Sequence, residues 1–244
     1  MALLEVRGVS KTFGSLKALG GVDVTVQPNT FHGLIGPNGS GKSTLLKAIA
    51  GAHFADGGTI SFDGMDVTTM LPADRSRRGL SLKFQITAVL LELSVYDNIL
   101  LAFQAHQPVW GLLRSLSRRN LHPEVMAALA RFQLADRADD LAGELSHGQQ
   151  QWLEIAMALT QKPKLLLLDE PTGGMSPEER RATGDLLVPI KQHCAMIIVE
   201  HDLDFIKDIC DRLTVLDNGQ VLDDGTVAEI EASTKVQEVY TTRV

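Results

Sequence analysis

Residues 36–44 read GPNGSGKST, and this stretch decides the fold prediction for the chain. The run matches G-x-x-x-x-G-K-[ST], with Gly36, Gly41, Lys42 and Ser43 at the fixed positions. Residues 30–35 before it are short and apolar, and residues 45–50 after it place apolar side chains at helical spacing. This order predicts a strand, a glycine-rich loop and a helix whose backbone N–H groups together bind phosphate.

The residue types in this loop indicate a nucleoside triphosphate as the ligand. Lys42 is expected to reach the β- and γ-phosphates as a point charge, and Ser43 is expected to hold Mg²⁺. The alternative is a glycine turn before an ordinary helix, which leaves the complete motif unexplained. The residues predicted to contact the nucleotide are Gly36, Pro37, Asn38, Gly39, Ser40, Gly41, Lys42, Ser43 and Thr44.

Composition limits the classes of partner and compartment. Among 244 residues, 23 Lys and Arg stand against 30 Asp and Glu, and this net charge of −7 disfavours nucleic acid as a partner. The 2 cysteines, Cys194 and Cys210, are expected to be buried thiols in a reducing compartment. No apolar run approaches the roughly 20 residues of a membrane span, and the N-terminus lacks a secretory signal. We therefore expect a soluble, cytoplasmic protein.

Strand and helix patterns predict three parts. Alternation over residues 3–9 and 18–26, with a hairpin near residues 59–64, predicts a small antiparallel β layer. Apolar runs at residues 165–168 and 195–199 predict buried parallel strands. Helical spacing dominates from Ser94, which is expected to cap the first helix, to about residue 160, and Asn218-Gly219 predicts a tight hairpin. The expected domains are residues 1–85 with 160–225 as the core, 86–159 as a helical insert, and 226–244 as a C-terminal helix and tail.

Two arginine-containing segments have open interpretations. The arginines at 75, 77 and 78 are read as one solvated helix face. Residues 107–123 are basic and partly apolar, which suits either a surface excursion packed on its own domain or contact with a membrane or membrane partner.

Asp169 and Glu170 end the apolar strand of residues 165–168, and this pair suits nucleotide hydrolysis. Asp169 is expected to hold Mg²⁺, directly or through water. Glu170 is expected to accept a proton from the attacking water. Acidic pairs at strand ends also cap helices, which is the alternative here.

These motifs in this order resemble the ATP-binding subunits of ABC transporters. The sequence Leu145-Ser146-His147-Gly148-Gln149 is similar to the family's LSGGQ signature and stands just before the strand that corresponds to Walker B. Gln85 stands at the place of the Q-loop glutamine, His201 at that of the switch histidine, and Phe13 at that of the aromatic residue that stacks on adenine. The resemblance extends over nearly the whole chain.

The resemblance implies roles for these residues. Glu170, His201 and Gln85 are the implied catalytic residues, with Gln85 also near Mg²⁺, and Phe13 the implied adenine contact. Ser146, His147, Gly148 and Gln149 are implied to cover the ATP of a second ATPase subunit in a head-to-tail dimer. From the residues alone, Phe13 can be a packing anchor, Ser146 an ordinary helix cap, His201 a surface histidine and Gln85 an ordinary strand end.

Two positions depart from the family pattern. His147 replaces the commoner second glycine of the signature, and Ser176 stands where an aspartate is common in the D-loop. The sequence Ser176-Pro177-Glu178-Glu179 predicts a capping box with proline at the first helical position. The strings LSHGQQQWLEIAM and Val199-Glu200-His201-Asp202 are similar to the importers of branched-chain amino acids, amides and urea, with the urea type most similar.

The resemblance implies an α/β phosphate-loop NTPase core, RecA-like with a mostly parallel sheet, plus the β layer and the helical insert. It implies an ATPase that uses ATP and Mg²⁺, pairs with an identical or related ATPase subunit, and docks on membrane permease subunits, with a solute-binding protein as an indirect partner. The expected location is cytoplasmic, peripheral on the inner face of the cell membrane. The alternatives are a soluble ABC ATPase of repair or translation, the ATPase of an ABC exporter, or a metabolic kinase.

Overall fold

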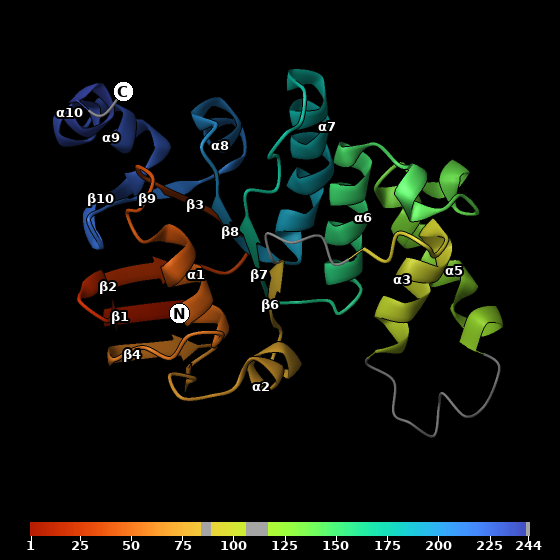
Figure 1. Ribbon diagram of the computed structural model, residues 1–244, viewed down its shortest axis with the longest axis horizontal. Helices are drawn as coiled ribbons and strands as arrows, with labels where there is room; N and C mark the ends of the chain where they lie inside the picture. The colour runs from red at the N-terminus through yellow and green to blue at the C-terminus, as the bar shows by residue number, and fades with distance from the viewer. Residues whose placement is uncertain (84–88, 106–116, 243–244) are drawn as a thin grey trace. The chain divides into compact units, whose positions relative to one another are not determined.

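The computed structural model describes residues 1–83, 89–105 and 117–242, and these form two compact units (Figure 1). The first unit contains residues 1–82, 164–171 and 188–244, and the second contains residues 83–163 and 172–187. The sequence placed residues 172–187 in the core, whereas they group with the helical unit. The functional domain boundaries given above stay a prediction.

A four-stranded antiparallel sheet in the order β2-β1-β4-β5 forms one layer of the first unit. Its strands are β1 (Leu4–Phe13), β2 (Leu16–Val26), β4 (Gly57–Phe62) and β5 (Met65–Asp66). The predicted antiparallel layer is therefore confirmed. Strands β1 and β2 extend beyond their alternating stretches to a tight hairpin at Gly14, which has a φ of 58°.

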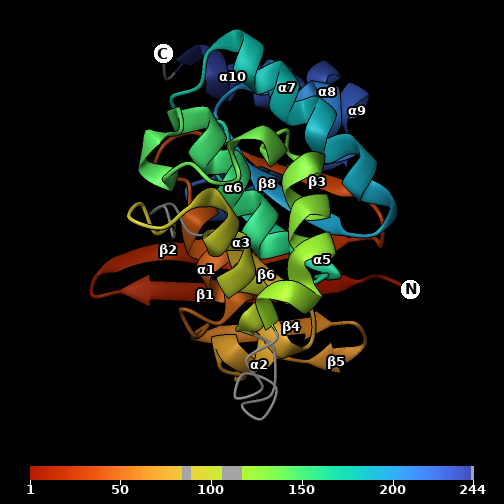
Figure 2. The same ribbon diagram turned by 90° about the vertical axis from the view of Figure 1, so that its right-hand side faces the viewer.

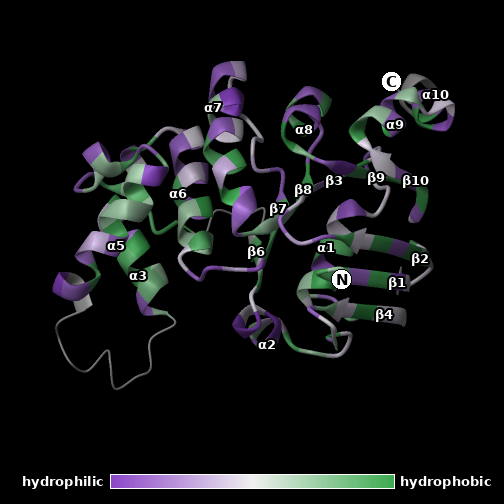
Figure 3. Cartoon of the chain, turned by 180° about the vertical axis from the view of Figure 1, so that it is seen from behind, coloured by the Kyte–Doolittle hydropathy of each residue, from purple (hydrophilic) through white to green (hydrophobic). Residues whose placement is uncertain are grey.

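The second sheet of this unit has six strands in the order β10-β9-β3-β8-β7-β6. The parallel strands β3 (Phe31–Ile35), β7 (Leu165–Asp169) and β8 (Ala195–Val199) are buried along their whole length, as continuous apolar strands require. Strand β9 (Arg212–Asp217) runs parallel to β3 and pairs antiparallel with β10 (Gln220–Thr226), and β6 (Leu80–Lys83) is the other edge. Figure 3 shows the apolar character of β7.

Helix α1 (Lys42–Ala50) contributes Leu45, Leu46 and Ile49 to an apolar core that also contains side chains from both sheets. This core therefore fixes the helix that follows the predicted phosphate loop. The other helices of the unit are α2 (Pro72–Arg77), α8 (Leu203–Ile209), α9 (Val227–Ala232) and α10 (Thr234–Thr242), with a 3₁₀ turn η3 (Val188–Gln192). Figure 2 shows these helices from a second direction.

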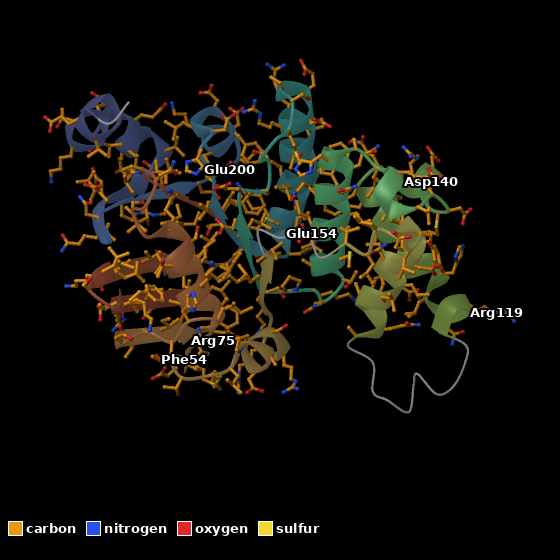
Figure 4. All side chains as sticks on the ribbon, in the orientation of Figure 1. Phe54, Arg75, Arg119, Asp140, Glu154 and Glu200 are labelled. Carbon is orange, nitrogen blue, oxygen red and sulfur yellow. The ribbon has the colours of Figure 1, made fainter. Side chains whose placement is uncertain are left out.

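The interpretation of Arg75 as part of a solvated face is wrong. Its side chain is fully buried, and its guanidinium donates hydrogen bonds to four main-chain carbonyl oxygens, those of Ala48, Ile49, Thr68 and Met70 (Figure 4). Two of these oxygens belong to the last turn of α1, where carbonyl groups lack the usual helical partners four residues later, although the Ala48 oxygen also accepts from the Gly51 N–H. Burial lowers the pKa of Arg75 to about 10, which leaves the group charged.

The second unit is helical. It contains α3 (Val95–Gln104), α5 (Ser117–Arg131), α6 (His147–Leu159) and α7 (Pro177–Leu187), with 3₁₀ turns η1 (Ala135–Arg137) and η2 (Ala142–Glu144). The predicted Ser94 cap is confirmed, because its side chain accepts a hydrogen bond from the Asp97 N–H. Most of the basic segment 107–123, through residue 116, lies outside the described residues. Within the described ranges, every helix is too short or too polar to cross a membrane.

Candidate nucleotide-binding site

The loop of residues 36–41 joins β3 to α1 and follows the predicted strand, loop and helix. Two of its glycines are required by close backbone approach. A Cβ on Gly36, at a φ of 143°, would lie 2.1 Å from the Leu216 carbonyl oxygen. A Cβ on Gly41, at a φ of 107°, would lie 2.6 Å from the Ala18 carbonyl oxygen.

The hairpin between β9 and β10 supports this loop, a role that sequence reasoning missed. The Gly219 N–H donates to the Ser40 carbonyl oxygen at 2.9 Å, and the Gly219 carbonyl oxygen accepts from the Gly20 N–H at 2.7 Å. Asn218 and Gly219 predicted a tight turn, which is confirmed by the β9–β10 pairing. Only the order of strands, which places β9 beside β3, brings this turn to the phosphate loop.

The N-terminus of α1 is open. Its N-cap is Gly41, no side chain caps it, and no acidic residue stands in its first turn. The Lys42 ammonium donates to the carbonyl oxygens of Gly36 at 2.7 Å and Pro37 at 3.0 Å. The Ser40 hydroxyl is buried and has no hydrogen-bond partner within the described residues. Uncapped donors, a lysine and an unpartnered hydroxyl fit a phosphate group.

Asp169 ends β7 beside this loop and is 5% exposed. The Ser43 hydroxyl donates to an Asp169 carboxylate oxygen at 3.4 Å. Burial raises the pKa of Asp169, while the Ser43 hydrogen bond acts against that shift. Burial also lowers the pKa of Lys42, against the opposing influence of Glu170 and Asp169. The structure therefore brings together Ser43 and Asp169, two of the three residues that were predicted to contact Mg²⁺.

Glu170 and His201 meet at the ends of two neighbouring parallel strands, β7 and β8. A Glu170 carboxylate oxygen lies 3.0 Å from His201 Nε2. The Glu170 N–H donates to the Val199 carbonyl oxygen. The backbone φ of Glu170 is 51°, which is unusual for a residue other than glycine. Glu200, labelled in Figure 4, is 5% exposed, and its carboxylate accepts from the His201 N–H.

Phe13 lies at the end of β1 and is 44% exposed, so it is no buried packing anchor. The His53 ring meets it edge to face with centroids 5.4 Å apart, and the Lys11 ammonium lies 5.5 Å from its centroid. The ring is thus held by neighbours while part of its surface stays open, as a stacking platform requires. Gln85, the remaining predicted residue of this site, lies outside the described residues.

The signature residues lie in the second unit, where they form the start of α6. The Ser146 hydroxyl accepts from the Gln149 N–H at 3.2 Å, and the Gln149 side chain accepts from the Ser146 N–H at 3.1 Å. This reciprocal pair is a capping box. His147 Nε2 lies 3.1 Å from the Gly173 carbonyl oxygen, so the histidine contacts the turn before α7.

Glu179 lies against the signature turn, and sequence reasoning assigned it only to a helix cap. That cap is confirmed, since its carboxylate accepts from the Ser176 N–H at 2.9 Å and its N–H donates to the Ser176 hydroxyl. The same carboxylate lies beside the Ser146 side chain and would lie 2.7 Å from a Cβ on Gly148. The Ser176 hydrogen bonds, and to a smaller extent the neighbouring Ser146 side chain, lower the pKa of Glu179.

The first unit therefore has the fold and site geometry of a phosphate-loop nucleoside triphosphatase. The sequence pattern of the family described as ABC transporter matches residues 19–173. The chain belongs to the ABC transporter family, and it is an ABC ATPase, as the sequence predicted.

Individual relatives agree with this assignment. The chain is 34% identical over 98% of its length to a probable branched-chain amino acid transport ATP-binding protein LivG of Archaeoglobus fulgidus, covering 95% of that protein. It is also 34% identical to the ribose import ATP-binding protein RbsA of Geobacillus kaustophilus, over 96% of this chain, but it spans only 47% of that relative's length. A crystal structure of a nucleotide-free ATP-binding cassette from an ABC transporter superposes with a TM-score of 0.87 at 31% identity, covering 98% of this chain and 99% of that one.

Proposed function

We propose that this chain is the ATP-hydrolysing subunit of an ABC importer for a branched-chain amino acid, or for a related small polar solute such as an amide or urea. Support comes from the LivG relative, which is matched over almost the full length of both chains. The ribose relative is equally identical but twice as long, so the full-length match favours the amino-acid class.

One observation carries the hydrolytic part of the proposal: the 3.0 Å contact between Glu170 and His201 in the same unit as the open phosphate loop. The loop and Lys42 would hold the triphosphate, and Phe13 would stack on adenine. Glu170 would take a proton from water as that water attacks the γ-phosphorus, and His201 would orient the water or the phosphate. The bond to the β-phosphate oxygen then breaks and leaves ADP.

Mg²⁺ would be held by the Ser43 hydroxyl and the Asp169 carboxylate, with Gln85 as a further contact implied by the family. Hydroxyl and carboxylate oxygens are the donors that this ion prefers. Within the described residues no group of three or more His, Cys, Asp or Glu side chains is placed to hold a metal, so phosphate oxygens and water would complete the shell. The ion supplies neutralisation of phosphate charge when bound.

The Ser146–Gln149 turn would cover the ATP held by a second ATPase subunit, either another copy of this chain or a related one. ATP bridging both subunits would close the dimer, and phosphate release would reopen it. The dimer would dock on permease subunits at the inner face of the cell membrane, with a solute-binding protein as an indirect partner. These assignments come from the family resemblance together with the capped α6 start.

The test of this shared site is Ser146→Arg in a Glu170→Gln background. We expect the double variant to bind ATP as a monomer with unchanged affinity but to form no MgATP-dependent dimer, because the long cation blocks the turn that must receive the partner's phosphate. Size-exclusion chromatography with MgATP and an equilibrium nucleotide titration provide the two measurements. Thr234→Arg, on the exposed start of α10, is the matched control. An intact dimer in the Ser146→Arg protein would refute the shared site.

The solute is tested separately, by uptake of labelled leucine, urea and a short amide in cells with and without this chain. Loss of leucine uptake that returns with the wild-type chain, but not with Glu170→Gln, supports the amino-acid class. Loss of urea uptake alone, or of amide uptake alone, would assign that compound as the solute in place of the amino acid. Normal uptake of all three would contradict it.

A further inference from the structure

A cavity lies within the first unit, and none of its lining residues belongs to the phosphate loop of residues 36–41. Its volume is about 210 Å³, it is partly open to solvent, and residues of α8, α9, α10, β9 and the end of β3 line it. That volume is below the roughly 300–1,000 Å³ of sites for drug-sized ligands, so only a small molecule fits. The apolar walls include Ile206, Leu213, Ile230 and Val236.

The rim of this cavity carries one positive and one negative side chain in contact. Lys207 of α8 and Glu231 of α9 also line it, and their ammonium and carboxylate groups lie 2.7 Å apart. The side chains are 35% and 49% exposed, and an ion pair this open to water contributes little to stability. A ligand with charges of its own can therefore replace the pair at small cost.

We propose that this cavity binds a free aliphatic α-amino acid of the size of valine, leucine or isoleucine. The alkyl side chain would occupy the apolar walls, the α-carboxylate would pair with Lys207, and the α-ammonium would pair with Glu231. A fatty acid would form an ion pair with Lys207 only and leave the Glu231 carboxylate without a partner. An alkylamine would pair with Glu231 only and leave the Lys207 ammonium without one. A sugar would bury hydroxyl groups against aliphatic side chains, where unpaired polar groups are costly.

The cavity touches the strand that leads into the phosphate loop. Ile35 is one of its lining residues, and the next residue is Gly36. Leu213 of the wall packs so closely on β3 that a Cβ on Gly33 would lie 2.5 Å from its side chain. A bound amino acid would thus contact side chains packed on β3. If it changes the affinity for ATP, then ATP must change the affinity for the amino acid by the same factor.

The experiment is a calorimetric titration of the purified full chain, without nucleotide, with L-leucine. Parallel titrations use 4-methylpentanoate and isoamylamine, which keep the alkyl group and one charge each. We expect leucine to bind and each single-charge analogue to bind at least about tenfold more weakly, because each leaves one rim charge without a partner. No binding of leucine at millimolar concentration, or equal binding of all three compounds, would overturn the proposal.

Variants identify the site. Glu231→Gln should weaken leucine binding at least about tenfold, because the α-ammonium loses its partner. Binding of 4-methylpentanoate should not weaken, since the acid pairs with Lys207 and no longer competes with the Glu231 carboxylate. Glu5→Gln, which breaks the Arg7–Glu5 ion pair of β1, is the matched control and should change the affinity for neither leucine nor 4-methylpentanoate. Ile230→Trp, which fills the cavity, should abolish leucine binding, and a thermal melt checks that it folds. Undiminished leucine binding in both folded cavity variants would overturn the assignment.

This inference stands apart from the proposed transport function. Binding is measured on the isolated chain, whereas transport requires the permease, so failure of one result does not imply failure of the other. If the chain binds leucine but energises urea uptake, the inference about this cavity stands and only the proposed solute changes.

Discussion

Two helix starts in this protein are expected to meet the phosphates of ATP, and they are built in opposite ways. The start of α1 has Gly41 at its N-cap, no capping side chain and a lysine at its first position. The start of α6 is closed by the reciprocal hydrogen bonds of Ser146 and Gln149, and the Glu179 carboxylate lies against it. No side chain caps the start of α1, whereas the start of α6 is capped by its own residues.

The difference has an energetic consequence. A phosphate at α1 meets a helix start that no side chain caps, and the protein contacts it has to share are those of Lys42 with the Gly36 and Pro37 carbonyl oxygens. A phosphate at α6 must share or replace the Ser146 hydrogen bonds and must approach a carboxylate. We therefore expect ATP to bind first at the phosphate loop of a single subunit, and the signature turn to join only when a second subunit closes over it.

Glu170→Gln separates binding at the open helix end from hydrolysis, and it should have the largest effect. Without a carboxylate to accept the proton from water, the rate of ATP hydrolysis should fall by about 10²–10⁴. ATP binding should persist, because the loop and Lys42 are unchanged. A phosphate-release assay and a nucleotide titration measure the two quantities. Glu124→Gln on α5 is the exposed control, and a Glu170→Gln enzyme with normal turnover would remove Glu170 from the mechanism.

Lys42→Ala tests the open helix end directly. The substitution removes the charged donor that now holds two loop carbonyl oxygens, so MgATP affinity should fall about 10²-fold, as expected for losing one or two hydrogen bonds to a charged group. Equilibrium titration with a fluorescent ATP analogue measures the change. Lys235→Ala, an exposed lysine of α10, controls for net charge. Equal affinity in the two variants would mean that the loop does not bind the triphosphate as described.

Glu179→Gln opens the closed helix end and should have the smallest effect. The amide oxygen can still accept from Ser176, but the negative charge beside Ser146 is lost. In a Glu170→Gln background, the MgATP-dependent dimer should tighten about two- to fivefold, the range expected for one charge at a helix terminus. Analytical ultracentrifugation measures its dissociation constant. The neighbouring exposed Glu178→Gln should leave it unchanged, and a weaker dimer in Glu179→Gln would show that the carboxylate supports the signature.

Much of the first site could be predicted because its motif is local. Residues 36–44 are contiguous, so the loop could be predicted from its motif alone. Asp169 and Glu170 follow an apolar run typical of a buried strand, and parallel strands end at the same edge of a sheet, so both residues could be placed near the loop. The hairpin at Asn218 and Gly219 was predicted, but not its hydrogen bond to Ser40, because that contact depends on strand order.

Arg75 and Glu179 show a second reason for failure. Both are charged residues in helical segments, where a solvated face or a simple cap is the usual outcome. Arg75 is instead buried, and its guanidinium donates to four carbonyl oxygens. Two of these, at Ala48 and Ile49, are more than 25 residues away in sequence. Glu179 fulfils its local cap and also reaches a helix start 33 residues earlier, at Ser146. Periodicity within a segment contains no information about such long-range partners.

The left-handed backbone of Glu170 sets thermal stability against the catalytic role that we propose for this residue. Holding a residue with a side chain at a φ of 51° lowers the free energy of unfolding by roughly 1 kcal/mol or more relative to glycine, which adopts this conformation freely. A variant with glycine at 170 would keep the Val199 hydrogen bond, relieve that cost and lose the carboxylate. If Glu170 is the base that we propose, the glycine variant should therefore melt at a higher temperature and hydrolyse almost no ATP.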